Sequence, residues 1–577
     1  MSLLIVFEGA TAIAGLDNAA VQRALGAAQQ QGFVHSRTLA WPGGQAMWFA
    51  TPGNPTGSGA SLVQGIDFAA YVGTMHWKGL SGEALLQRLL AEFDRPHDMP
   101  LRDFSGGFAM LFARQGQVWL FNDAVGLQKI YRIAQEGIVS TSLRVCRVAL
   151  QRPRLNRMRA QEYVLLGANH ATQTPLEGLQ VLEPTQAREL RGGTVVTIHP
   201  AQAWRTAAEF KSPAEAVSTL ADMIAANFAS LLQAYGSNVG MALSGGFDSR
   251  LLLAALQHHG VAPRLYVYGH PESADVRIAS TKARELGLSI ECTDKDSVNA
   301  ALAPLSANLL HRNLAFFDGL PVDGVFDRGA DRATRLAQVA DGFLNLNGGG
   351  GEILRNFFYL PERGYSAMDL VGAFYSNWLP RAIADPDERH AFTAATADGI
   401  LASLGFDGGS TRSRSLTLRR SDVELVYTLF RLRWWMARNN TVAAQHGAFM
   451  TPLVQPRLVE LAAQVPISWK TFGELEAAII TRLSPAVASG PSNYGFDFSQ
   501  GPNAAHRRYI KATLFRPIRV RRLSSRIRRL LGRNPKANAP AEWSQAYALA
   551  EVDWLDTAGL TDDAQFNRLF TLCALLE

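Results

Sequence analysis

A glycine-rich run, Ser244-Gly245-Gly246-Phe247-Asp248-Ser249, combines residue types that could bind phosphate. Residues 237–243 before it become mostly apolar toward their end, which is typical of a buried strand, and Arg250 to His259 after it have the apolar stripe of a helix. Glycines let the backbone approach an anion, and N–H groups at a helix start point toward it. The two serines add hydroxyl donors, and the Asp248 carboxylate suits Mg²⁺. The run therefore predicts a site for the phosphates and metal ion of a nucleoside triphosphate.

No lysine follows these glycines, so the run is not the G-x-x-x-x-G-K-[ST] loop. It resembles the S-G-G-x-D-S loop of the ATP pyrophosphatase family of adenylating enzymes, and every fixed position matches. Members of that family cleave ATP between the α and β phosphates and place AMP on a carboxylate or carbonyl oxygen. The resemblance implies that Ser244, Gly245, Gly246, Asp248 and Ser249 bind ATP. The alternative is a glycine turn between a strand and a helix that binds no nucleotide.

The chain has 577 residues, which is long enough for two or more domains. Its 47% hydrophobic and 18% charged residues are typical of a soluble globular protein. The three cysteines are widely spaced and lack a C-x-x-C pair, which disfavours zinc and a disulfide framework. The start has no secretory signal, and no apolar run reaches about eighteen residues. We therefore expect a cytoplasmic protein without a membrane segment.

The elements that position the run divide the chain near residue 210. Short apolar runs alternate with turns over 1–208, which predicts an α+β domain with many strands. A long amphipathic helix at 213–234 then begins with Ser212 as N-cap and Pro213 in its first position. After the run, a strand at 264–268, a helix at 274–286 and a strand at 288–292 alternate as in a parallel sheet. We expect this α/β domain at 209–577, with its ligand at the carboxyl ends of the strands.

Further runs along the chain resemble the asparagine synthetase family. They lie at 104–109, 122–131, 212–216, 269–275 (G-H-P-E-S-A-D) and 449–459. The resemblance implies a degenerate class II glutamine amidotransferase domain with an Ntn-like sandwich at 1–208. It also implies a PP-loop ATP pyrophosphatase (synthetase) domain with many helices at 209–577, in which Val267, Gly269 and Asp275 lie near the nucleotide.

Residue 2 is the first departure from this family. Glutamine-hydrolysing relatives carry Cys there, whereas this chain has Ser2, and a hydroxyl is a far weaker nucleophile than a thiol at neutral pH. The residues Ser2-Leu3-Leu4 also look like the opening of a strand. We therefore expect no glutaminase and no ammonia, so an amine of the substrate itself must be the nucleophile.

Two further departures concern the synthetase site. The run L-N-G-G-G-G-E-I at 346–353 contains one carboxylate, and the resemblance implies that Glu352 binds the metal ion together with Asp248. Gly348, Gly349 and Gly350 are expected to bind pyrophosphate, and the alternative is a flexible loop. At 490–498 the family usually has a lysine that stabilises the adenylated intermediate, and this chain has none. Lys470, Lys282 and Arg438 are the candidates to replace it.

Longer runs are most similar to the lasso peptide macrocyclases, within the same family as the β-lactam synthetases. They lie at 350–358, 431–439 and 491–495. The resemblance implies that an Asp or Glu side chain of a precursor peptide is adenylated by ATP and Mg²⁺. The peptide's own N-terminal amine then attacks, which gives a macrolactam, AMP and pyrophosphate. It also implies a leader-binding protein and a leader protease as partners. The alternatives are a small-molecule amide synthetase of the β-lactam or asparagine type, and a non-catalytic or RNA-directed nucleotide binder.

Two groups of residues outside the ATP loop are candidates for substrate contact. Glu424 lies on a probable helix about two turns before Arg431, and it is either a general base or substrate orienter, or a surface glutamate paired with an arginine. The arginines and tryptophans at 431–438 either pack in a core or line a peptide groove.

The segment 507–536 holds twelve Lys or Arg and no Asp or Glu. It is a solvated helix face or a docking surface for an acidic partner. Nucleic acid is disfavoured, since Tyr509 and Phe515 are its only aromatic residues.

Overall fold

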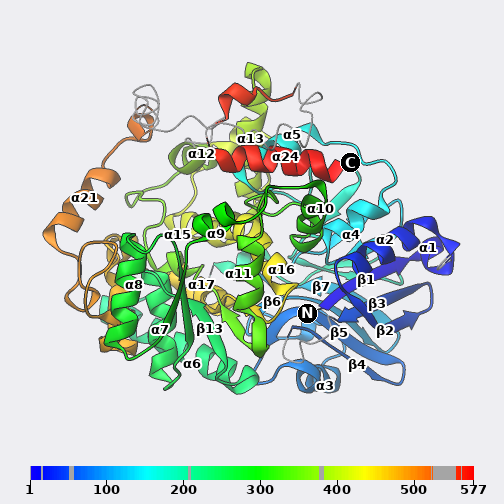
Figure 1. The fold of residues 1–577 in the computed structure, drawn as a ribbon, viewed down its shortest axis with the longest axis horizontal. Coiled ribbons are helices and arrows are strands. Elements are labelled where there is room, and N and C mark those ends of the chain that lie inside the picture. The colour runs from blue at the N-terminus through cyan, green and yellow to red at the C-terminus, as the bar shows by residue number, and fades with distance from the viewer. Residues whose placement is uncertain are drawn as a thin grey trace.

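Two six-stranded antiparallel sheets lie face to face in the N-terminal part of the computed structural model, which describes residues 2–14, 17–50, 58–205, 209–375, 382–521, 523, 554–560 and 562–576 (Figure 1). The first sheet has the order β10 (Leu179–Val181), β8 (Tyr131–Ile133), β9 (Ile138–Ser140), β1 (Ser2–Glu8), β3 (Gly44–Ala50), β2 (Val34–Trp41). The second has the order β12 (Val195–Thr197), β11 (Gln186–Glu189), β7 (Gln117–Asn122), β6 (Ser105–Arg114), β5 (Asp67–His76), β4 (Ala60–Gln64).

Apolar side chains on both faces of β1 show why the two sheets stack. Leu4 and Val6 pack between the two sheets, whereas Ile5 and Phe7 point to the other side, against α2 (Ala19–Gln30) and α4 (Leu143–Ala149). On the outer face of the second sheet, α3 (Gly82–Glu92) packs with four buried leucines at helical spacing. The layers are therefore helix, sheet, sheet and helix, which confirms the expected α+β sandwich as an architecture.

Helix α6 (Pro213–Tyr235) joins the sandwich to the rest of the chain. It begins as predicted, with Ser212 Oγ accepting a hydrogen bond from Glu215 N at 3.2 Å and Pro213 in the first turn. At its other end the Tyr235 hydroxyl donates to the carbonyl of Met75 in β5, at 2.7 Å. The predicted boundary at 208/209 stays a prediction, because residues 206–208 lie outside the described residues.

A five-stranded parallel sheet follows, and its strand order places the loop after β13 at the centre. The order is β15 (Ile290–Thr293), β14 (Arg264–Tyr268), β13 (Val239–Ala242), β16 (Leu344–Leu346), β17 (Phe449–Met450). Helices α7 (Phe247–His258) and α8 (Ala274–Glu285) connect its first strands. The strand at 264–268 and the βαβ alternation are confirmed, while α7 begins three residues before the predicted start at Arg250. Together with the helices this is the mixed α/β fold that the sequence predicted.

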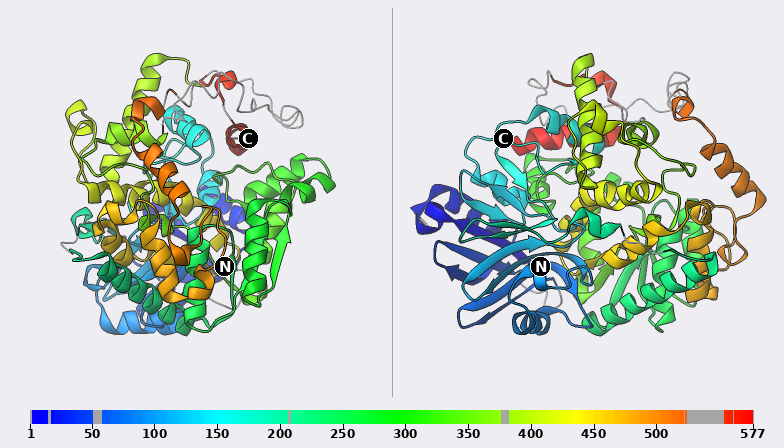
Figure 2. Two further views of the ribbon diagram at one scale, coloured as in Figure 1. Left: turned by 90° about the vertical axis from the view of Figure 1, so that its left-hand side faces the viewer. Right: turned by 180° about the vertical axis from the view of Figure 1, so that it is seen from behind.

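Helices dominate the remainder of the chain, and several of them pack back onto the N-terminal part (Figures 1 and 2). They are α9 (Lys295–Ala301), α10 (Ala307–Phe316), α11 (Ala330–Gln338), α12 (Ala367–Phe374), α13 (Pro386–Ser403), α14 (Thr411–Arg414), α15 (Arg420–Val426), α16 (Ala437–Ala444), α17 (Pro456–Gln464), α18 (Ile467–Lys470), α19 (Glu474–Leu483), α20 (Pro485–Ala488), α21 (Ala504–Leu514) and α24 (Asp563–Leu576). Helix α24 lies along α5 (Arg157–Leu166), where Arg568 Nε donates to Val164 O at 2.8 Å.

The chain between α15 and α16 forms a π-helix, Tyr427–Met436, which the sequence did not predict. Such wide turns are rare and occur mostly at functional sites.

Part of the basic segment lies outside the described residues, namely 522 and 524–536. Within the described part, α21 stands at the periphery of the molecule (Figure 1) and buries Ile510 and Leu514. None of the described helices is both long and apolar enough to cross a membrane.

Candidate functional site

The loop at 244–249 connects β13 to α7, and its side chains fasten the turn. Ser249 Oγ accepts from Ser244 N at 3.0 Å and lies 2.9 Å from Ser244 Oγ. Gly245 N donates to Asp275 Oδ1 at 2.9 Å, which ties the loop to the start of α8. The structure therefore brings Asp275 to the predicted loop, at the carboxyl ends of β13 and β14. Val267 and Gly269 lie at the same end of β14.

The segment 491–495 packs so closely against Gly245 that no side chain fits at this position. The sequence placed this segment near the site only through its resemblance to the family. A Cβ on Gly245 would lie 2.3 Å from Asn493 Oδ1, and Asn493 N donates to Gly245 O at 3.0 Å. Asn493 also donates to Asp275. The segment 491–495 thus forms one wall of the phosphate loop.

The second glycine run follows β16, the other neighbour of β13. Gly349 N donates to Asn347 Oδ1 at 2.7 Å, and Gly350 N donates to Glu352 Oε2 at 3.0 Å. The Tyr427 hydroxyl, from the π-helix, donates to the same Glu352 oxygen at 2.6 Å. Two of the N–H groups predicted for pyrophosphate are therefore bonded to side chains in this state. Glu352 stands on the first turn after the run, in the 3-10 helix Gly351–Leu354.

Arg355, at the end of that turn, is the centre of the site. Its Nη2 donates to both oxygens of Asp248, at 2.7 and 2.8 Å, and its Nε lies 2.9 Å from Glu476 Oε2. Its Nη1 donates to the Tyr494 hydroxyl at 2.9 Å. The guanidinium also stands 5.4 Å from the ring centroid of Phe247. Four segments far apart in sequence meet around this one side chain.

Burial shifts the protonation of the two carboxyl groups that Arg355 joins. It raises the pKa of Asp248 to about 6, with Arg355 opposing the rise and Glu352 adding to it. It also raises the pKa of Glu476, which is fully buried, and Arg355 opposes this rise too. Glu476 therefore keeps its proton more readily than Asp248, and the ionised Asp248 is the main partner of Arg355.

A cavity of about 530 Å³ opens beside these residues. Its polar lining residues include Asp248, Glu352, Arg355 and Lys470, of which the Lys470 side chain is fully buried. Its walls are largely aromatic and include Phe357, Phe358, Phe374, Phe472 and Tyr494. Helix α21 closes one side with His506 and Ile510. A few converging polar groups within apolar walls are typical of a binding site for an organic ligand.

Lys470 is the one of the three candidate cations that reaches the cavity. It is fully buried, and its Nζ donates to Glu424 Oε2 at 3.0 Å and to the carbonyl of Ala462. Burial lowers its pKa, and Glu424 opposes this. Lys282 instead pairs with Glu285 at 2.6 Å, and Arg438 pairs with Asp318 at 2.9 Å. Neither of these two lines the cavity around Asp248 in the described part of the chain.

Glu424 lies behind Lys470 and not on the cavity surface. It is 8% exposed and also pairs with Arg420 at 3.0 Å, so the expected arginine partner is present although the glutamate is not on the surface. The arginine partner of the second sequence interpretation is present, whereas the role as a general base or substrate orienter stays a prediction; in the structure Glu424 also holds the Lys470 ammonium.

Magnesium fits the donors at this site. Over the described ranges, no three His, Cys, Asp or Glu side chains are arranged to hold a metal ion by themselves. Mg²⁺ is usually held by one or two carboxylates, with phosphates and waters completing its shell. Asp248 and Glu352, which follow adjacent strands, offer such a pair of oxygen donors.

Ser2 is built into the first sheet. It pairs with Ala50, is 6% exposed, and donates its hydroxyl hydrogen to Ser58 O. A Cβ on Gly59 would lie 2.2 Å from its Oγ, so the hydroxyl is enclosed. The structure therefore favours the strand interpretation of Ser2 over that of a nucleophile.

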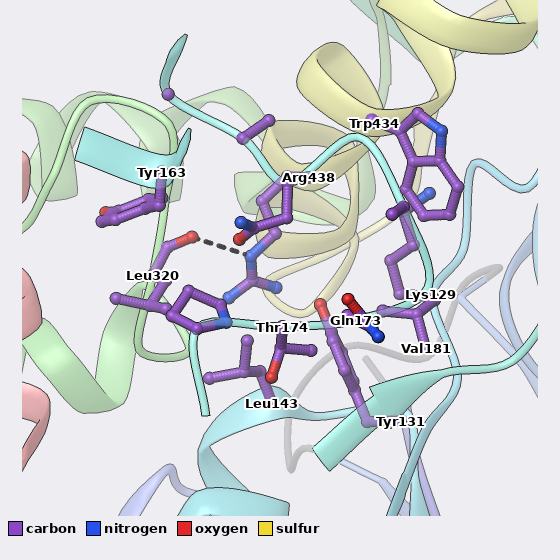
Figure 3. Close-up of a pocket in the computed structure, with 15 residues that line it drawn as sticks. Lys129, Tyr131, Leu143, Tyr163, Gln173, Thr174, Val181, Leu320, Trp434 and Arg438 are labelled. Carbon is purple, nitrogen blue, oxygen red and sulfur yellow. Dashed lines mark hydrogen bonds between the residues drawn. The ribbon is translucent and has the colours of Figure 1, made fainter. Parts of the chain in front are cut away.

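The arginines and tryptophans at 431–438 lie between the sandwich and the helices. Trp434 and Arg433 are buried, and Arg433 Nε donates to Val125 O at 2.7 Å. Trp434 and Arg438 line a second cavity of only about 50 Å³, together with Lys129 (Figure 3). Lys129 Nζ donates to Arg433 O at 2.6 Å, and burial lowers its pKa to about 7. The core interpretation of this cluster is therefore favoured over a peptide groove.

Three residues of the site were not identified from the sequence: Arg355, Glu476 and Tyr427. Glu476 lies among the apolar residues of 475–480, so an acid within a buried face was a signal that could have been used. Arg355 lies one turn after Glu352 within a run quoted for its resemblance. Tyr427 gave no signal, because the π-helix changes which face of the helix it occupies.

No family model and no curated protein sequence matches this chain. Among solved structures, it is similar to the glutamine phosphoribosylpyrophosphate amidotransferase from B. subtilis complexed with ADP and GMP. The match has 10% identity and a TM-score of 0.23, and covers 52% of this chain and 92% of that chain. A TM-score this low does not establish a shared fold, and no family is assigned on it.

Proposed function

We propose that this protein is an ATP-dependent, AMP-forming carbon–nitrogen ligase that closes a macrolactam in a lasso peptide precursor. The observation that carries the proposal is that Asp248 of the phosphate loop and Glu352, which follow adjacent parallel strands, line one cavity, with the buried Lys470 in its wall. The motifs at 350–358, 431–439 and 491–495 supply the peptide as substrate class.

The reaction has two steps. A carboxylate oxygen of a peptide Asp or Glu attacks the α-phosphorus of ATP, the bond to the bridging oxygen breaks, and pyrophosphate leaves. The peptide's α-amine then attacks the activated carbonyl, forms the amide bond, loses a proton and displaces AMP. When bound, Mg²⁺ would be held by Asp248 and Glu352 and would neutralise phosphate charge.

The chain's own residues supply binding and charge. The positive end of α7 favours the phosphates, and the buried Lys470 places a positive charge in the cavity wall. Glu424 keeps that ammonium in place. The aromatic walls exclude water, which protects an acyl-adenylate from hydrolysis.

A small-molecule amide or β-lactam synthetase is the second candidate. It is favoured by the cavity volume of about 530 Å³, which is within the range of sites for small ligands. The two candidates share the loop, the metal pair and Lys470, and differ in what the aromatic walls hold.

Mass spectrometry with ATP and Mg²⁺ tests the proposal. The substrate is the peptide encoded by a short gene beside this one, with a leader-binding protein and a leader protease added. We expect loss of one water from the core peptide, together with AMP and pyrophosphate. Release of ADP would refute the AMP-forming ligase, and incorporation of free ammonia would favour an asparagine-type reaction.

Asp248→Asn should abolish pyrophosphate release. Asp398→Asn is its matched control, because Asp398 is also held by two bonds from one arginine, Arg414, but lies far from the cavity. It should leave the reaction unchanged. Retained activity in Asp248→Asn would contradict the role given to this carboxylate.

A further inference from the structure

Arg355 holds both oxygens of Asp248, the carboxylate that we propose as a metal ligand. Nη2 bridges the two carboxylate oxygens at 2.7 and 2.8 Å and so takes the chelating position between them. Gly351 lies close to Oδ1, because a Cβ at that position would be 2.3 Å from this oxygen. A divalent cation and a guanidinium cannot share this space, since both are positive and both need the same lone pairs.

The rest of the guanidinium has two further contacts that can remain when the Asp248 contact is exchanged. Nε lies 2.9 Å from Oε2 of Glu476, which is fully buried. Nη1 donates to Tyr494, on the segment whose Asn493 borders the phosphate loop. The Arg355 side chain is 19% exposed, and that exposure faces the cavity.

We propose that Arg355 is a built-in counter-ion that occupies the metal position at Asp248 until ATP arrives, and then turns Nη2 to the phosphates. The Glu476 contact is the pivot of this movement, and the Tyr494 contact keeps the guanidinium beside the loop. Bound in this way, Arg355 supplies a positive charge to a site whose 490–498 segment has no lysine. A guanidinium suits the task because its planar fork can donate two hydrogen bonds to phosphate oxygens.

The arrangement makes metal and nucleotide binding interdependent. Without ATP, the metal must displace Arg355 with nothing to receive the guanidinium. With ATP, the phosphates accept it, so the metal and the nucleotide bind together. The inference rests on the proposed function, because it takes metal–ATP as the ligand of the loop.

Binding measurements without any peptide test it. The probes are Mn²⁺ alone, and Mn²⁺ with an ATP analogue that cannot be cleaved between the α and β phosphates. In Arg355→Met, Mn²⁺ alone should bind at least tenfold more tightly than in the wild type. The analogue with Mn²⁺ should bind at least tenfold more weakly, because its phosphates lose the guanidinium.

A second comparison keeps the test valid if Arg355→Met does not fold. Arg355→Met combined with Glu476→Gln leaves no unpaired buried acid behind, and it is compared with Glu476→Gln alone. The same two changes in affinity are expected. Arg414→Met is the matched control, because it frees Asp398 from an equivalent pair on the surface and should change neither affinity.

The outcomes separate this inference from the proposed function. The proposal that Arg355 is a counter-ion is wrong if Arg355→Met does not change the affinity for Mn²⁺. It is also wrong if Arg414→Met raises that affinity by the same factor. An unchanged affinity for the analogue overturns the movement to the phosphates. If the wild type does not bind the analogue at all, the proposed function fails, whereas failure to find a cyclised peptide leaves these results standing.

Discussion

A methyl group at Gly351 would test whether Asp248 must stand where the structure places it. A Cβ at residue 351 would lie 2.3 Å from Asp248 Oδ1 and 3.1 Å from Glu476 Oε1. The φ angle of Gly351 is not positive, so alanine causes no backbone strain there. The Asp248 carboxylate must therefore retreat by roughly 1 Å to reach an ordinary contact. That movement breaks the 2.7 Å bond from Arg355.

Gly351→Ala should lower the reaction rate strongly and the free energy of unfolding only slightly. A misplacement of about 1 Å at a reacting centre costs roughly 100-fold in rate, or about 2.7 kcal/mol of barrier. Because the displaced atom ends a short side chain facing a cavity, the free energy of unfolding should fall by only about 1 kcal/mol. Pyrophosphate release with the peptide measures the first quantity, and denaturant unfolding measures the second.

Gly240→Ala is the matched control for this substitution. Gly240 lies in β13, and a Cβ there would have its nearest neighbour at 3.7 Å, an ordinary contact. It should keep the rate within about twofold, in line with the small effect of an accommodated methyl group. If Gly351→Ala reacts as fast as Gly240→Ala, then the position of Asp248 does not limit the reaction and the metal assignment is wrong.

Three further predictions concern the lysine, acid stability and a helix. Lys470→Met should lower the rate of pyrophosphate release at least 100-fold per folded molecule. Lys282→Met removes a buried lysine outside the cavity and should not lower this rate. Equal losses of rate in the two variants would show that the role of Lys470 is purely structural. Burial lowers the pKa of His76 to about 4, below its value in the unfolded chain, so stability is intact above pH 6.5 and is lost as the pH falls toward 4. When the pH falls from 7.5 to 5, this histidine should lower the free energy of unfolding by about 2 kcal/mol. In denaturant titrations, His76→Gln should not show this loss of about 2 kcal/mol between the two pH values. Gly26→Ala, inside α2 with open space around the new Cβ, should raise the free energy of unfolding by about 0.5–1 kcal/mol, and a lower melting temperature would contradict this.

The parallel sheet could be predicted because its signals are local. Glycines mark the loop after β13, and Arg264–Tyr268 is an apolar run between a proline and a glycine, so its ends were predicted correctly. Strand β2 was missed because its apolar and polar residues do not alternate regularly and it lies at the edge of its sheet, where most of its side chains are exposed. Edge strands carry little hydrophobic alternation, so the pattern on which such predictions rest is absent.

The charge arrangement of the site could not be predicted from sequence. Asp248 and Glu352 were identified because each lies in a glycine-rich run after a strand. Arg355 is separated from Asp248 by 107 residues, and Glu476 lies on a third element. Only the fold brings Arg355 between Asp248 and Glu476, and without this positive charge the burial of the two carboxyl groups would destabilise the protein.

The N-terminal sandwich contributes to the site through the π-helix and not through Ser2. At one end of that helix, Tyr427 fixes Glu352 by a 2.6 Å hydrogen bond. Toward the other end, Arg433 bonds to Val125 O, and Lys129 bonds to the carbonyl of Arg433. Both of these contacts come from the turn after β7, inside the sandwich. A change in that turn therefore alters the helix that holds Glu352, whereas the Ser2 hydroxyl is enclosed in its strand.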